Sequence, residues 1–302
     1  MTASETASQS RPIVSLVEAV RTLEGGGFPV RRPFPTAELP LYDPFLLLDH
    51  LGPVEWGPGE AIGAPDHPHR GFETVSYVLA GRKQHKDSAG HSGRLGPGDV
   101  QWMTAGAGVV HSEMPEAEFH RTGGLQHGFQ IWVNLPRKDK LMRPRYQDIP
   151  AERIPEAQSA DGKVRVRVIA GQALGAGAVI ETVIPIFYLH FVVQPGGRHS
   201  QPIPAAHNAL AYVFAGSACL GPEQTPVPEG HMAAFGAGDA IELGLPADAQ
   251  GPGELLLLAG TPLNEPVARW GPFVMNTREE IIQAARDYEE GRMGRIAPTV
   301  GA

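Results

Sequence analysis

Two short motifs contain the residues with which this sequence could bind a metal ion. His67 and His69 stand one residue apart in "DHPHRGFETVSYVLAG", and His111 and Glu113 repeat that spacing in "TAGAGVVHSEMP". Residues i and i+2 of an extended strand point to the same side, so each pair can converge on one point. Three imidazoles and one carboxylate suit several transition metals, and a set with open positions suits an iron(II) ion that meets dioxygen or a substrate. We therefore predict one divalent metal ion, with Fe(II) favoured and Ni, Cu, Mn, Co and Zn as alternatives.

A second carboxylate, that of Glu73, competes with Glu113 for the place of fourth ligand. Counted along a strand, Glu73 shares a face with His67 and His69, but Gly71 can bend the chain and spoil the count. No glycine lies between His111 and Glu113. We predict Glu113 as the ligand and Glu73 as a neighbouring or ordinary strand residue. No other histidine belongs to an H-x-H or H-x-E pair, although His127 could reach the same cavity.

The elements that must position these residues are short β-strands. The 302 residues include 37 glycines and 29 prolines, which punctuate apolar or alternating runs such as "FETVSYVLAG", "FQIWVNLP", "KVRVRVIAG" and "ALAYVFAG". Strands of this length between turn residues are typical of a sandwich or barrel. One helix is predicted near the C-terminus, where Thr277 and Glu280 form a capping box and Gly291 ends the pattern. We expect Ile281, Ile282, Ala285 and Tyr288 to form its apolar stripe.

An internal sequence repeat indicates that the barrel occurs twice. "ETVSYVLAG" followed by "LGPGDVQWM" is answered by "NALAYVFAG" followed by "FGAGDAIEL" in the second half. Aligning Tyr77 with Tyr212 places residues 202–204, "PIP", opposite the first histidine pair, and makes "ELLLLAG" the counterpart of the strand with the second pair. Neither stretch offers equivalent ligands. The metal site is therefore expected in the N-terminal barrel alone.

Charge, cysteine content and hydropathy exclude several classes of function. The formal net charge of −8 disfavours binding to a phosphate backbone, so no direct nucleic-acid partner is expected. Cys219 is the only cysteine, which excludes an internal disulfide and a thiolate metal cluster. No run approaches the roughly 18 apolar residues of a membrane span, and the polar start "MTASETASQSR" lacks the apolar core of a secretory signal. We expect a cytoplasmic protein whose first 12 residues are disordered.

The motifs resemble those of the pirin family of the cupin superfamily. "HPHRGFETVSYVLAG", "GPGDVQWMTAGAGVVHSEMP" and "FQIWVNLP" are similar to the N-terminal pirin signature, and "GTPLNEPVARWGPFVMNTREEIIQAARDYEEGRMG" is similar to the end of its C-terminal domain. The resemblance implies an all-β protein of two tandem cupin barrels with a short C-terminal helix. We assign residues 13–150 to the metal-binding barrel and 151–302 to the barrel without metal. The family's ligand set falls on His67, His69, His111 and Glu113.

The resemblance implies two classes of function, because fold and metal alone do not choose between them. The favoured expectation is a quercetin 2,3-dioxygenase-type enzyme, which cleaves the ring of a flavonol with dioxygen at a mononuclear iron. Glu113 would take the proton of the 3-hydroxyl group, with Glu73 as the fallback base. The alternative is a non-enzymatic, metal-dependent regulator that acts through protein contacts. A purely structural metal ranks lowest, since closed structural zinc sites are usually rich in cysteine.

Overall fold

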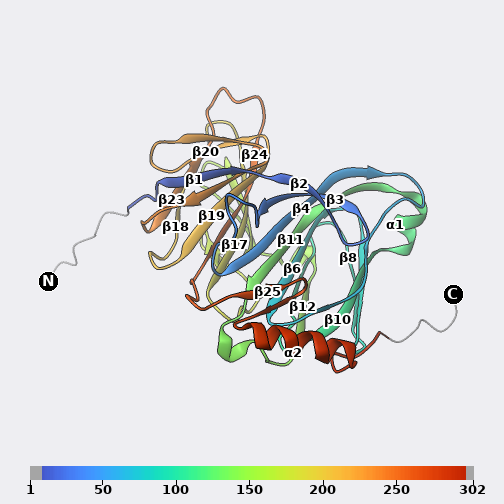
Figure 1. Cartoon of the computed structure of the whole chain (residues 1–302). Coiled ribbons are helices and arrows are strands. Elements are labelled where there is room, and N and C mark those ends of the chain that lie inside the picture. Colours follow the sequence, from blue (N-terminus) through green and yellow to red (C-terminus); the bar gives the residue numbers. More distant parts are fainter. Residues whose placement is uncertain (1–8, 297–302) are drawn as a thin grey trace. The chain divides into compact units, whose positions relative to one another are not determined.

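The structure is a computed structural model that describes residues 9–296, and it consists of two β-barrels with two α-helices (Figure 1). The predicted all-β fold of two cupin barrels with a short C-terminal helix is confirmed. The expected disorder of residues 1–8 lies outside the described residues. Arg11, from the rest of that predicted segment, is buried and donates hydrogen bonds to the carbonyl oxygens of His207 and Pro204, both at 2.8 Å.

The first barrel contains residues 20–153 and, of the described chain, residues 263–296. Its large sheet has the order β12-β9-β6-β11-β4-β3-β2, and its small sheet has the order β5-β10-β7-β8. The strands of the large sheet are β2 (Val20–Glu24), β3 (Phe28–Phe34), β4 (Phe45–Trp56), β6 (Phe72–Ala80), β9 (Val100–Thr104), β11 (Gly124–Asn134) and β12 (Arg145–Ile149). Those of the small sheet are β5 (Ala64–His69), β7 (Lys83–Asp87), β8 (Ser92–Leu95) and β10 (Val109–Pro115).

The second barrel contains, of the described chain, residues 9–19 and 154–262. Its sheets have the orders β1-β22-β19-β24-β17-β14-β13 and β18-β23-β20-β21, with a small hairpin β15-β16 beside them. The strands are β1 (Ile13–Glu18), β13 (Glu156–Gln158), β14 (Val164–Ala170), β15 (Gln172–Ala173), β16 (Ala176–Gly177), β17 (Ile186–Val193), β18 (Arg198–Pro202), β19 (Asn208–Ala215), β20 (Ser217–Leu220), β21 (Thr225–Pro228), β22 (His231–Phe235), β23 (Ala240–Gly244) and β24 (Gly253–Gly260). Side chains such as Val166, Phe191, Leu220 and Leu257 fill its interior with one apolar core.

These two units differ from the predicted ranges 13–150 and 151–302. Strand β1 pairs with β22, so the first strand of the chain is an edge of the second barrel. After the second barrel the chain adds the hairpin of β25 (Ala268–Trp270) and β26 (Phe273–Met275) and then helix α2 (Arg278–Glu289) to the first barrel. The cause is burial, because Phe273, Met275 and Ile281 form a core cluster with Val110 of β10.

The predicted capping box of the C-terminal helix is confirmed. The Thr277 side chain accepts a hydrogen bond from the backbone N–H of Glu280, whose carboxylate accepts one from the backbone N–H of Thr277. The predicted apolar stripe is only partly right, since Ile281 and Ala284 are buried while Ile282 and Tyr288 are exposed. The short helix α1 (Ala117–Thr122), capped by the Glu116 carboxylate, was not predicted. Short 3-10 turns occur at Arg137–Asp139 and Ala151–Arg153.

The duplication is present, but the predicted strand equivalences are wrong. In sheet order β6 matches β19 as expected, whereas β9 matches β22, and β5 and β10 match β18 and β23. The strand "ELLLLAG" is β24, the counterpart of β11. A longer loop between β18 and β19 than between β5 and β6 displaced the alignment. None of the described helices has the length and apolar character that crossing a membrane requires.

Candidate metal centre

The two histidine motifs lie on neighbouring antiparallel strands of the small sheet. His67 on β5 is directly opposite His111 on β10, and His69 is opposite Val109. Opposite residues of an antiparallel pair share a face, so parity brings all three imidazoles to one side. Beyond His111 the register shifts, and Glu113 lies opposite Ala64. This bulge places the Pro65 carbonyl oxygen 2.7 Å from Nδ1 of His67.

The three imidazoles present their Nε2 atoms to one another. Because a carbonyl can only accept, His67 carries its proton on Nδ1 and leaves a lone pair on Nε2. That Nε2 lies 3.0 Å from Nε2 of His69 and 3.0 Å from Nε2 of His111. Two nitrogens at about 2.1 Å from a metal ion and at right angles to each other would be about 3.0 Å apart. The residues therefore fit a transition-metal ion bound by three Nε2 atoms.

Burial keeps two of these imidazoles neutral, as metal ligands must be. His69 and His111 are 2% and 1% exposed. Burial lowers the pKa of His69 well below its ordinary value, and the neighbouring imidazoles lower it further. Burial likewise lowers the pKa of His111 to about 3, against the opposing charge of Glu113. A metal ion binds the lone pairs of unprotonated imidazole nitrogens. A site that disfavours protonation of these nitrogens and directs their lone pairs to one point is therefore suited to a metal ion.

Glu113 stands beside the triad but is held by other side chains. Its Oε1 accepts hydrogen bonds from Ser76 Oγ at 2.8 Å and from Lys83 Nζ at 3.1 Å. Burial raises the pKa of Glu113, but the charge of Lys83, the imidazoles and the Ser76 bond outweigh it, so the pKa lies well below the ordinary value. The compact metal-binding group in the described chain consists of the three histidines alone. Since both bonds go to Oε1, Oε2 is the oxygen left for a metal ion.

Glu73, expected as a neighbouring or ordinary strand residue, does not share a face with His67 and His69. Gly71, at φ +89°, separates β5 from β6, so the histidines and Glu73 lie in different sheets. On β6 it is Phe72 and Ser76 that contact the site, through His69 and Glu113, and Glu73 points to the other face. There the Glu73 carboxyl accepts a hydrogen bond from Thr104 at 2.6 Å, and burial raises its pKa. Glu73 is therefore neither a ligand nor a base for this site.

His127, which could have reached the cavity, pairs with His50 instead. Their Nε2 atoms are 2.7 Å apart. In the second barrel, His199 and Gln201 stand on β18, the counterpart of β5, and face Leu243 and Ile241 of β23. These two apolar residues belong to the core of that barrel. In the described part of the second barrel, these positions on β18 and β23 therefore do not offer the three imidazoles of the triad.

A cavity of about 510 Å³ opens onto the histidines of the first barrel. Its walls carry aromatic and aliphatic side chains, namely Phe28, Leu47, Leu51, Met114, Phe119 and Trp132, and charged ones, namely Glu24, Asp49, Asp66, Arg82, Lys83, Glu113 and Arg269. Trp132 meets the His69 ring edge to face, with centroids 5.3 Å apart, and carries the Arg269 guanidinium 4.8 Å from its own centroid. The cavity has the size and mixed lining of a small-molecule site.

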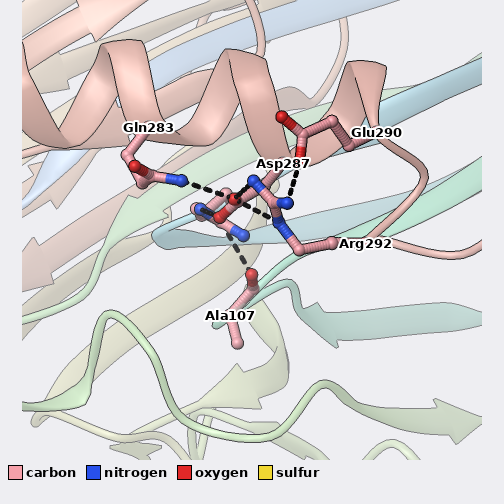
Figure 2. A network of polar contacts seen from close by, with 6 residues as sticks. Ala107, Gln283, Asp287, Glu290 and Arg292 are labelled. Carbon is pink, nitrogen blue, oxygen red and sulfur yellow. Dashed lines mark hydrogen bonds and ion pairs between the residues drawn. The ribbon is translucent and has the colours of Figure 1, made fainter.

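The C-terminal segment fastens the strand that carries His69. Arg70 donates from Nε to the Ala107 carbonyl oxygen at 2.7 Å and from Nη1 to Asp287 Oδ2 at 2.6 Å. Figure 2 shows Gln283 and Arg292 converging on the same Asp287 carboxylate, each at 2.7 Å. The ion pair is largely enclosed, with 10% and 14% of the two side chains exposed. Helix α2 therefore holds Arg70, the residue next to His69 of the histidine triad.

Comparison with known proteins agrees with this architecture. The family profile named Pirin matches residues 27–133, and the one described as the Pirin C-terminal cupin domain matches residues 188–294. The chain belongs to the pirin family. This pirin is 43% identical to a pirin-like protein of Solanum lycopersicum over 295 residues, covering 97% of each chain. It is 45% identical to pirin of Homo sapiens over 276 residues, covering 90% of each.

Among solved structures, this pirin is similar to the quercetin 2,3-dioxygenase from Acinetobacter baumannii. The TM-score is 0.88 at 36% sequence identity, with 95% of this chain and 99% of that chain covered. A structure from Geobacillus kaustophilus, called GK1651, is similar with a TM-score of 0.73 and 33% identity, covering 86% and 100% of the two chains. These similarities agree with the fold of two cupin barrels.

Sequence reasoning missed the residues that surround the triad. Lys83 and Ser76 hold Glu113, and Arg269 reaches the cavity from a strand near the other end of the chain. Lys83 could have been found, because it lies opposite Pro115 on the strand paired with β10 and so shares parity with His111 and Glu113. No local pattern marks Arg269, since its place depends on the C-terminal segment joining the first barrel.

Proposed function

We propose that this pirin is a metal-dependent oxidoreductase of the quercetin 2,3-dioxygenase type, acting on a small aromatic substrate with dioxygen. The observation that carries the proposal is the cavity of about 510 Å³ that opens onto His67 and His69 and has Trp132 and Phe28 in its walls. Cavities of about 300–1,000 Å³ hold ligands of flavonol size. The similarity to a quercetin 2,3-dioxygenase supports the same class of chemistry.

We assign the metal to Nε2 of His67, His69 and His111 and to Oε2 of Glu113, with Fe(II) as the favoured ion. A bound ion would supply a template and a Lewis acid for the flavonol and dioxygen. The residues of the chain exclude water and position the carboxylate. Aliphatic and aromatic walls exclude water from the rings, and the bonds from Ser76 and Lys83 fix the Glu113 carboxylate.

We also assign to Glu113 the role of receiving the proton of the flavonol 3-hydroxyl group. Its lowered pKa makes it a weak base, so it passes the proton to solvent in the cavity and does not retain it. Glu73 has no part in this transfer, because it faces away from the cavity.

The test starts from protein purified without added metal and then loaded with iron. We expect about one iron per chain and oxygen-dependent release of carbon monoxide from quercetin, both lost in His69→Ala. The matched control is His231→Ala, which removes a histidine of the second barrel whose contact is the Glu229 carbonyl oxygen. Iron-loaded protein that releases no carbon monoxide above the Glu113→Ala variant would refute the enzyme proposal. Metal binding without turnover is the result expected of a metal-dependent regulatory protein.

A further inference from the structure

Two glutamine side chains of β11 line the cavity but have no part in the proposed proton transfer. Gln126 and Gln130 stand four residues apart on this strand, and both are half-buried. The two ends of a glutamine amide differ, because its oxygen only accepts hydrogen bonds and its NH2 group only donates them. The end that each amide turns towards the cavity therefore determines which groups of a ligand it can bind.

The neighbours of Ser76 fix the orientation of the Gln130 amide. Ser76 Oγ lies 2.8 Å from Glu113 Oε1 and 3.3 Å from Lys83 Nζ. It also lies 2.7 Å from Oε1 of Gln130. A serine hydroxyl has a single proton to donate, and Glu113, as the carboxylate partner of Lys83, can only accept it. The end of the Gln130 amide beside Ser76 must therefore be a donor.

A half-turn of the Gln130 amide satisfies all of these groups. It exchanges the positions of the oxygen and the NH2 group, so that Nε2 donates to Ser76 Oγ. The serine then accepts from Gln130 and Lys83 and donates to Glu113, which uses both of its lone pairs and its proton. In the described chain the other end of this amide has no protein partner, and the residue lines the cavity. That end is the amide oxygen, which can only accept.

The orientation of the Gln126 amide is fixed by Trp56. The indole Nε1 donates a hydrogen bond of 2.6 Å to Gln126 Oε1, and an indole N–H can only donate. The NH2 group of Gln126 is thus left without a protein partner among the described residues. Strand β11 therefore offers the cavity an acceptor at Gln130, near Glu113, and a donor at Gln126, with roughly 10–13 Å between the two Cα atoms.

We infer that Gln130 determines specificity by accepting a hydrogen bond from a hydroxyl group that the ligand keeps protonated, while Gln126 donates one to an oxygen farther along the ligand. The ligand class is an elongated aromatic compound with at least two hydroxyl groups, one for the metal centre and one for Gln130. An analogue without the second hydroxyl group leaves the Gln130 oxygen unpaired and binds more weakly. The inference rests on the proposed function for the aromatic character of the ligand, but it concerns recognition and not turnover.

The experiment measures equilibrium binding of flavonols to zinc-loaded protein, because zinc is redox-inactive. Quercetin is compared with fisetin, which lacks the 5-hydroxyl group, and with kaempferol, which lacks the 3′-hydroxyl group. Galangin against kaempferol tests the 4′-position, and 3-hydroxyflavone against 3,7-dihydroxyflavone tests the 7-position. Loss of one of these hydroxyl groups should weaken binding to the wild type about 10-fold, and in Gln130→Met the same loss should cost about 2-fold or less.

Three further variants separate recognition from general damage. Ser76→Ala frees the Gln130 amide to turn either end to the cavity, so the preference for that hydroxyl group should shrink although Gln130 is still present. Any effect of Ser76→Ala on Glu113 acts on all the flavonols alike. Gln126→Met should weaken quercetin but keep the preference. The matched control Gln158→Met removes an exposed amide from β13 of the second barrel and should change neither affinity nor preference.

Equal losses in wild type and Gln130→Met for every hydroxyl group would overturn the inference, and so would failure of all the flavonols to bind. It would also be wrong if the preference survived in full in Ser76→Ala, or disappeared in Gln126→Met or Gln158→Met. Failure of the proposed enzyme function looks different. In that case the preference that depends on Gln130 is present, while iron-loaded protein releases no carbon monoxide from quercetin.

Discussion

The ion pair of Arg70 with Asp287 connects helix α2 to the strand of His69, the proposed metal ligand, so its removal has a defined consequence. Asp287→Asn keeps the shape of the side chain and removes its charge. Arg70 would then remain 8% exposed, with the Ala107 carbonyl oxygen and a neutral amide as its partners. An enclosed guanidinium without a carboxylate partner destabilises the folded protein. The end of β5, which carries His69, also loses its ion pair with helix α2.

The size of the effect follows from how enclosed the pair is. Removing one partner of a buried pair costs about 3–5 kcal/mol. Asn can still accept from Arg70, and both side chains retain some contact with water, at 10% and 14% exposure, so we expect the low end, about 3 kcal/mol. Because the groups around metal ligands affect metal affinity about 10- to 100-fold, we also expect zinc to bind about 10-fold more weakly.

The assay is chemical unfolding of the metal-free protein combined with competitive zinc titration, for wild type, Arg70→Met, Asp287→Asn and the double variant. The cycle should give a coupling energy of about 2 kcal/mol. The matched control is Glu290→Gln, which removes an exposed carboxylate from the end of the same helix, near the labelled Arg292 of Figure 2, and should cost less than about 0.5 kcal/mol. Additive single variants, or an unchanged zinc affinity in Asp287→Asn, would refute the reasoning.

Four further outcomes are expected. Lys140→Met should destabilise the protein by about 2–4 kcal/mol in chemical unfolding, because a 1%-exposed ammonium that donates three hydrogen bonds is lost. Gly71→Ala should cost more than about 2 kcal/mol in the same assay, since its Cβ would lie 2.0 Å from the Val274 carbonyl oxygen at a φ of +89°. Zinc at about 100 times its dissociation constant should stabilise the wild type by about 2.7 kcal/mol and leave His69→Ala unchanged, as thermal melts would show. Burial lowers the pKa of His50 to about 3, so only the unfolded chain takes up that proton below about pH 6.5. Acid should therefore destabilise wild type relative to His50→Phe by about 1.4 kcal/mol per pH unit in unfolding titrations from pH 6 to 4.5.

The sequence predicted the triad because each histidine motif acts within one strand. The i, i+2 rule needs no knowledge of the rest of the fold, and it held for His67, His69 and His111. It does not extend to Glu73, because the chain passes from one sheet to another at Gly71, the glycine for which the sequence had already set that count aside. Counting alternate residues therefore predicts a shared face only within one continuous strand. Here the strand ends at Gly71, a glycine with positive φ.

Features that depend on distant segments were out of reach of pattern reasoning. The repeat correctly indicated two barrels, yet the similar turns "GPGD" and "GAGD" paired β9 with β23, whereas its counterpart in sheet order is β22. The surroundings of the site, such as Arg269 on Trp132 and Arg70 on Asp287, join residues far apart in the chain. These contacts form only after each segment has packed on one of the two barrels. Which barrel it packs on depends on the apolar surface that the whole segment buries there.

The division of the chain between the barrels also sets an order for folding during synthesis. The second barrel needs β1 and residues 154–262, so every part of it has left the ribosome once Pro262 emerges. The first barrel still lacks the hairpin with Arg269 and helix α2 with Asp287, which follow the second barrel in the chain. Domains usually fold as units in order from the N-terminus. Here the second barrel can be finished first, and the surroundings of His69 are completed only after it.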